Sequence, residues 1–88
     1  MENFKKLESV LRDTFGLDEN ADVTSMQFGP EPPWDSVGHA ILIVAIEDAF
    51  DVTFDMDEVP ELLDFPKLVS ALNRAGVSIP APAGTVPA

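Results

Sequence analysis

The chain contains no cysteine, and its few basic residues are confined to its two ends. Without cysteine it has neither a disulfide framework nor a thiolate metal site. Its longest unbroken apolar run, from Ala40 to Ile46, is far too short to span a bilayer. Residues 1–6 lack the apolar core of a signal peptide. From 88 residues of this composition we therefore expect one small cytoplasmic domain.

The placement of charge says more than the formal net charge of -11. The five basic residues lie near the ends: Lys5, Lys6, Arg12, Lys67 and Arg74. Residues 18–64 hold 13 of the 16 acidic residues and no lysine or arginine. Nucleic acids and anionic membranes are bound through basic patches, so neither is an expected partner. A partner with a basic surface fits better, although acids that only keep a small domain soluble explain the same charge.

The apolar periodicity predicts an all-α fold, a small four-helix bundle of three main helices and one short helix. The main helices are expected at about residues 2–15, 36–50 and 65–75. Gly16 and Gly76 stop the first and last of these helices, because glycine adopts the left-handed conformation that follows many helices. Asp35 and Asp64 are candidate N-caps.

Proline and acidic residues shape the remaining segments. Residues 17–35 form a long loop, in which three prolines forbid a helix before Asp35, and a loop of this length is usually functional or crosses the structure. Pro60 leaves room only for a short helix or turn within residues 55–63. Residues 77–88 show no periodicity, so a folded domain over residues 1–76 and a disordered tail over residues 77–88 are predicted.

The second helix carries more apolar residues than a single core face requires. Leu42, Ile46 and Phe50 make a core-facing stripe, whereas Val37, Ile41 and Val44 lie on another face that starts beside Ser36. That second face is either an exposed recognition patch or is covered by the long loop through Met26 or Phe28.

Ser36 can be a helix cap, a nucleophile or an attachment point. A hydrolase that uses Ser36 with His39 as its base is disfavoured, because the chain lacks a Gly-x-Ser-x-Gly elbow and has one histidine. His39 is therefore interpreted as a partly exposed helix residue. Residues 55–60 fail the pattern of a calcium loop at its third ligand position and at its glycine, so no metal site is expected. A plain acidic helical interaction module remains an alternative.

Several motifs together resemble the acyl carrier protein family. They are Asp35-Ser36-Val37 at a helix start, the helix end Ala45-Ile46-Glu47-Asp48-Ala49-Phe50-Asp51, then Phe54, a short acidic segment and a last helix after Asp64. The match covers about residues 3–75. Val37 replaces the leucine usual in the family. With Trp34 and Gly38-His39, the sequence around Ser36 resembles that of discrete carriers of specialised pathways rather than that of the housekeeping fatty-acid carrier.

The resemblance implies a carrier without catalytic residues. Ser36 would bear a covalent 4′-phosphopantetheine arm, and Asp35 would shape the loop and interact with the transferase or its metal ion. The arm would hold acyl intermediates as thioesters in fatty-acid-like, polyketide or other secondary metabolism. A discrete aminoacyl or peptidyl carrier is the alternative.

Partners of such a carrier are also implied by the resemblance. They are a phosphopantetheinyl transferase and acyl-loading and acyl-processing enzymes with basic docking surfaces, and the carrier itself is expected to be a monomer. The residues expected to contact them are Val37, Ile41, Val44, Glu47 and Asp48.

Overall fold

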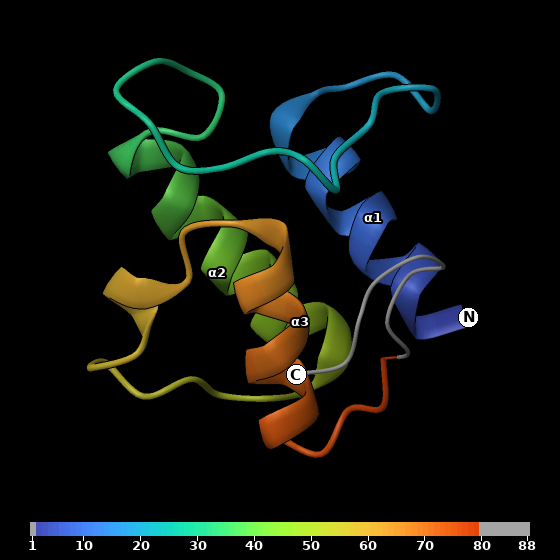
Figure 1. The fold of residues 1–88 in the computed structure, drawn as a ribbon, viewed down its shortest axis with the longest axis vertical. Coiled ribbons are helices and arrows are strands. Elements are labelled where there is room, and N and C mark those ends of the chain that lie inside the picture. The colour runs from blue at the N-terminus through green and yellow to red at the C-terminus, as the bar shows by residue number, and fades with distance from the viewer. Residues whose placement is uncertain (1, 80–88) are drawn as a thin grey trace.

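The structure, a computed structural model, describes residues 2–79, which form three α-helices around one apolar core (Figure 1). The elements are α1 (Glu2–Phe15), α2 (Ser36–Phe50), the 3-10 turn η1 (Val59–Glu61) and α3 (Phe65–Arg74). No β-strand occurs within residues 2–79, which agrees with the all-α class. The expected short helix is a three-residue 3-10 turn, so a count of four helices is not confirmed.

The predicted signals at the ends of the α-helices are present in the structure. Gly16 follows α1 with φ 66°, in the left-handed region that suits glycine. Asp64 is the N-cap of α3, and its Oδ1 accepts a hydrogen bond from the Lys67 N–H at 2.9 Å. Asp35 caps α2 in the same way.

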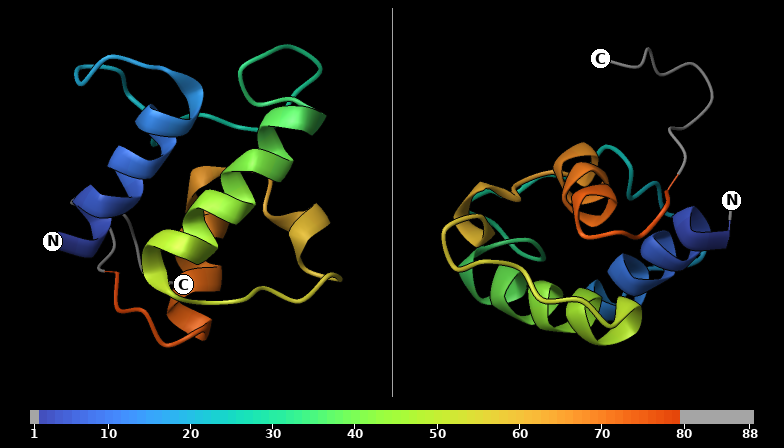
Figure 2. Two further views of the ribbon diagram at one scale, coloured as in Figure 1. Left: turned by 180° about the vertical axis from the view of Figure 1, so that it is seen from behind. Right: turned by 90° about the horizontal axis from the view of Figure 1, so that it is seen from below.

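The three helices surround a common interior, as the view from below in Figure 2 shows. α1 packs against α2, and the rings of Phe4 and Phe65 join α1 to α3 edge to face, with their centroids 5.4 Å apart. Side chains from all three helices and from the connecting segments are fully buried there: Leu7, Leu11, Val23, Trp34, Leu42, Ile46, Leu62, Phe65, Leu68 and Leu72.

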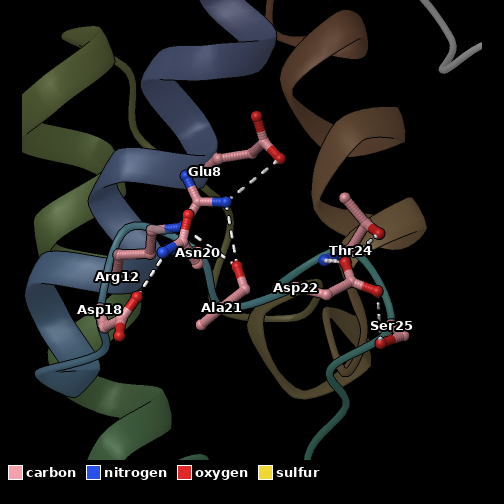
Figure 3. Close-up of polar contacts among 8 residues, drawn as sticks. All are labelled: Glu8, Arg12, Asp18, Asn20, Ala21, Asp22, Thr24 and Ser25. Carbon is pink, nitrogen blue, oxygen red and sulfur yellow. Dashed lines mark hydrogen bonds and ion pairs between the residues drawn. The ribbon is translucent and has the colours of Figure 1, made fainter.

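The first part of the long loop is attached to α1 by polar contacts (Figure 3). Arg12 donates from Nε and Nη2 to the carbonyl oxygen of Ala21, at 3.2 and 3.0 Å, and lies 3.7 Å from a carboxylate oxygen of Glu8. Asp22 accepts hydrogen bonds from the hydroxyl and the N–H of Thr24. These bonds from Thr24 hold the pKa of Asp22 below its ordinary value.

The second part of the loop crosses the molecule to the segment before α3. Phe28 donates its N–H to the carbonyl oxygen of Leu63 at 2.7 Å, and Gln27 and Asp64 form an isolated antiparallel bridge. Val23 is buried on the way, and Phe28 packs against the core. The loop is therefore a structural part of the fold, with its own buried side chains and backbone partners.

The C-terminal end of the described chain differs from the expected boundary at Gly76. Ile79 is buried in the core, and its N–H donates to Oδ1 of Asn73 at 2.9 Å. Asn3 donates to the carbonyl oxygen of Ser78 at 2.9 Å. A single buried residue after a glycine leaves no periodic signal in the sequence. Residues 77–79 thus pack on the domain, and the rest of the predicted tail, residues 80–88, lies outside the described residues.

Candidate functional site

Ser36 is the first residue of α2, and its side chain is exposed. The capping group of this helix is the preceding residue, because Oδ1 of Asp35 accepts the Gly38 N–H at 2.9 Å. Asp35 has extended backbone angles, as an N-cap requires. The hydroxyl of Ser36 therefore stands at a helix N-terminus that is already capped, which leaves it available for other chemistry.

The loop that leads to Ser36 lies directly on the first turn of α2. Gly29 donates its N–H to the carbonyl oxygen of Trp34 at 2.9 Å, which closes a small loop over residues 29–34. A Cβ atom at Gly38 would overlap the carbonyl oxygen of Pro33. Only glycine permits this approach, so Gly38 allows the backbone that precedes Ser36 to rest against the helix.

His39 is buried, at 8 % exposure, so the expectation of a partly exposed helix residue is wrong. Trp34, at 1 % exposure, donates from Nε1 to His39 Nδ1 at 3.0 Å, and His39 Nε2 lies 2.8 Å from the carbonyl oxygen of Val59. The rings of Trp34 and His39 are nearly parallel, and the ring of Phe28 meets His39 edge on. The sequence gives little sign of this cluster, since its members approach one another only through the loop and η1.

These contacts also bear on the hydrolase alternative. Both ring nitrogens of His39 already have hydrogen-bond partners, Trp34 on one side and Val59 on the other. A general base must reach the proton that it removes. His39 has no free nitrogen for the hydroxyl of Ser36, so the structure does not assemble a nucleophile and base from these two residues.

The second apolar face of α2 is exposed to solvent. Val37, Ile41 and Val44 are 69 %, 54 % and 65 % exposed, so the long loop does not cover them. Asp48 is also exposed and continues the same stripe at a step of four. The structure thus places four of the five predicted partner-binding residues on one face that begins beside Ser36.

Glu47, the fifth of these residues, has a different environment. It is half-buried, and its Oε2 accepts the N–H of Phe54 at 2.8 Å. This bond ties the last turn of α2 to the segment that follows the helix. Glu47 therefore contributes to the fold, a role that the sequence prediction missed.

Residues 2–79 show neither a cluster of metal-binding side chains nor a helix suited to span a membrane. No group of three or more metal-binding side chains gathers in this part of the chain. None of its helices is long and apolar enough to cross a membrane.

Comparison with known proteins supports the family resemblance in broad terms. The chain is 27 % identical over 73 residues to a protein named acyl carrier protein from Phaeodactylum tricornutum (strain CCAP 1055/1). The match covers 83 % of this chain and 96 % of that protein. No family model and no solved structure matches the chain. The similarity agrees with a carrier protein that has no catalytic activity of its own.

Proposed function

We propose that this protein is an acyl carrier protein whose Ser36 bears a 4′-phosphopantetheine arm. The observation that carries the proposal is the exposed Ser36 hydroxyl at the N-terminus of α2, beside a cap supplied by Asp35. The similarity to an acyl carrier protein over most of the chain supports it. The cargo would be an acyl intermediate of fatty-acid-like, polyketide or other secondary metabolism.

The residues around Ser36 fit a phosphodiester attached to its oxygen. The first N–H groups of an α-helix have no acceptor within the helix, and the helix dipole places partial positive charge there. Such an end stabilises an anion without a basic side chain. In this chain α2 has no lysine or arginine, and the Asp35 carboxylate is directed to the Gly38 N–H. The helix N-terminus can therefore hold a negative group in an acidic region.

The contribution of this protein to the chemistry is to hold Ser36 in position and to keep it accessible. The arm, when attached, supplies the terminal thiol that carries an acyl group as a thioester. Ser36 supplies the oxygen to which a phosphopantetheinyl transferase joins the arm; the diphosphate bond of coenzyme A breaks and adenosine 3′,5′-bisphosphate leaves. Asp35 holds the first turn of α2 in shape. Because Ser36 is exposed, both the transferase and later enzymes can reach it.

The exposed face of α2 is the proposed contact surface for partner enzymes. Val37, Ile41 and Val44 supply its apolar part, and Asp48 supplies charge. An exposed apolar patch often marks an interaction site. Acidic groups complement a basic surface and raise the association rate. A basic docking surface on the transferase and on acyl-processing enzymes fits both features.

Mass spectrometry of the intact protein tests the attachment site. After incubation with coenzyme A, Mg²⁺ and a permissive phosphopantetheinyl transferase, we expect the wild type to gain the mass of one phosphopantetheine. Ser36→Ala should gain none and should keep its helical circular dichroism, because the cap is Asp35. Ser70→Ala, which alters another exposed helical serine, is the matched control and should be modified fully. An unmodified wild type, or a modified Ser36→Ala, would refute the proposal.

A further inference from the structure

Two hydrogen bonds in series, one buried and one partly buried, join three segments around Ser36. Trp34 belongs to the loop that precedes Ser36, His39 to the first turns of α2, and Val59 is the first residue of η1. His39 is three residues after Ser36, so it lies one helical turn further along α2. Of these three residues, His39 is the one that contacts both of the others.

The hydrogen-bond partners determine the protonation state of the His39 ring. An indole nitrogen can only donate, so Nδ1 of His39 must accept from Trp34. A backbone carbonyl can only accept, so Nε2 of His39 must carry a proton and donate to Val59. Both bonds therefore require the neutral ring with its proton on Nε2.

We propose that neutral His39 is a positioning residue for Ser36, and that protonation of its Nδ1 releases the preceding loop. In the neutral state the ring holds the loop through Trp34 and holds η1 through Val59. The protein would thus present Ser36 in a fixed setting while the ring is neutral and in a looser one once the ring is protonated. The consequence for arm attachment rests on the proposed function, whereas the hydrogen-bond chain itself does not.

The hydrogen bonds of His39 to Trp34 and to Val59 respond differently when Nδ1 takes up a second proton. An N–H at Nδ1 would face the N–H of the Trp34 indole, so that bond is lost. The Nε2–H donor remains, so the bond to Val59 persists. Trp34 is almost fully buried, and a buried donor without an acceptor is costly. The loop over residues 29–34 must then shift to give the indole another partner, while η1 stays in place.

The charged groups on the segments that meet His39 have one sign. Residues 29–35 and 58–61, which flank the two bonds, carry four acidic residues: Glu31, Asp35, Glu58 and Glu61. The Asp35 carboxylate accepts from the Gly38 N–H, and Glu58 accepts from the Asp55 N–H and pairs with Arg74. Within residues 2–79 no carboxylate lies within ion-pair distance of the His39 ring. A second proton on the ring therefore has no carboxylate partner, and of the two hydrogen bonds of the ring it breaks only the one from Trp34.

Two substitutions separate the two bonds. His39→Asn places an oxygen near the position of Nδ1, so it keeps an acceptor for Trp34 and loses the donor to Val59. His39→Gln places an amide nitrogen near the position of Nε2, so it keeps the donor to Val59 and loses the acceptor. Neither side chain titrates. The pair is a matched test of which bond serves which segment.

Nuclear magnetic resonance of the protein without an arm provides the first readout. We expect the nitrogen shifts of the His39 ring to show the Nε2-protonated tautomer at neutral pH. On acidification the Trp34 indole N–H resonance should move in step with the His39 titration in the wild type and stay constant in His39→Asn. Exchange of that indole proton should be about tenfold faster in His39→Gln, as for loss of one buried hydrogen bond. The opposite tautomer, or an indole resonance that ignores the titration, would overturn the proposal, even if a variant fails to fold.

The rate of arm attachment provides the second readout. His39→Gln should be modified several-fold more slowly than the wild type at neutral pH, and His39→Asn should keep the wild-type rate. The ratio of the wild-type rate to the His39→Asn rate should decrease as the pH is lowered. Taking this ratio cancels the pH dependence of the transferase itself. Equal rates in all three proteins would overturn the positioning role. A wild type that accepts no arm at all would instead refute the proposed function and leave the magnetic resonance result to decide this inference.

Discussion

Helix α2 has two apolar faces of similar composition in opposite environments. Leu42 and Ile46 are completely buried, whereas Ile41 and Val44, each adjacent in sequence to a buried residue, are 54 % and 65 % exposed. α1 covers the first face, and the long loop passes over the first turn of the helix instead of over the second face. The difference shows that apolar residues in a small domain can exceed what its few elements are able to cover.

The start of the same helix combines both environments within four residues. Ser36 and Val37 are exposed, while Gly38 contacts the loop and His39 is buried. A side chain next to a tightly packed turn is held in position by that turn. The packed residues of α2 thus hold Ser36 in position, whereas the exposed residues of the same helix are accessible to a partner.

The largest expected effect compares truncations on the two faces. Leu42→Ala and Ile46→Ala should each lower the free energy of unfolding by about 2–5 kcal/mol, because they leave cavities in the core. Ile41→Ala and Val44→Ala should change it by about 0.5 kcal/mol or less, as for surface positions. Chemical denaturation of the four variants measures this. Losses of about 2 kcal/mol at Ile41 or Val44 would mean that those side chains belong to the core.

The next effect tests the contact between the loop and the first turn of α2. Gly38→Ala should cost about 1–3 kcal/mol of stability, because its Cβ would overlap the carbonyl oxygen of Pro33 and force a shift. Gly29→Ala, in the loop that contacts Gly38, is the matched control, since a Cβ there meets nothing within 4 Å. It should be neutral or slightly stabilising. Equal thermal melting of the two variants would show that the loop does not need the close approach.

A comparable effect separates the neighbouring acids at the end of α2. Glu47→Ala should cost about 1.5–3 kcal/mol, as for loss of a hydrogen bond to a charged group, because it leaves the Phe54 N–H without its acceptor. Asp48→Ala should leave the free energy of unfolding nearly unchanged, because Asp48 is exposed. Denaturation curves for both variants give the comparison. If Asp48→Ala were the more damaging, the assignment of Glu47 to the fold would be wrong.

Binding kinetics test the exposed face without disturbing the core. With the transferase as partner, Asp48→Lys should slow association and flatten its dependence on salt, because charge steers the encounter. Ile41→Ala and Val44→Ala should instead raise the dissociation rate by about fivefold, as for a contributing contact in an interface. Surface plasmon resonance at two salt concentrations measures both rates. Unchanged rates in all three variants would remove this face from the proposed contact surface.

The smallest effect is expected at the exposed hydrogen bonds of Asp22. Its lowered pKa comes first from the hydroxyl of Thr24, so Thr24→Ala should raise the pKa part of the way toward its ordinary value. A carboxylate with a lowered pKa stabilises the fold above its ordinary titration range. That contribution is lost as the pH falls through the lowered pKa. A carbon-detected titration of the Asp22 carboxyl checks this, and an identical midpoint in wild type and variant would contradict it.

Much of the architecture follows from local signals in the sequence. The three α-helices lie where periodicity predicted them, and Gly16, Asp35 and Asp64 take the terminal positions expected of them. Such features depend on residues within one or two turns of each other, so the sequence is enough to predict them. The role of Ser36 as an arm-bearing residue stays a prediction, which mass spectrometry can decide.

By itself the sequence determined the helices, their caps, the acidic centre of the chain and the apolar surplus of α2. Only the tertiary structure decided which side chains are covered. It buried His39 between Trp34 and Val59, turned Glu47 toward Phe54 and brought Ile79 into the core. Helix periodicity and caps arise from neighbours along the chain. Burial and these hydrogen bonds depend on partners that approach only when the loop has crossed the molecule and the helices have packed.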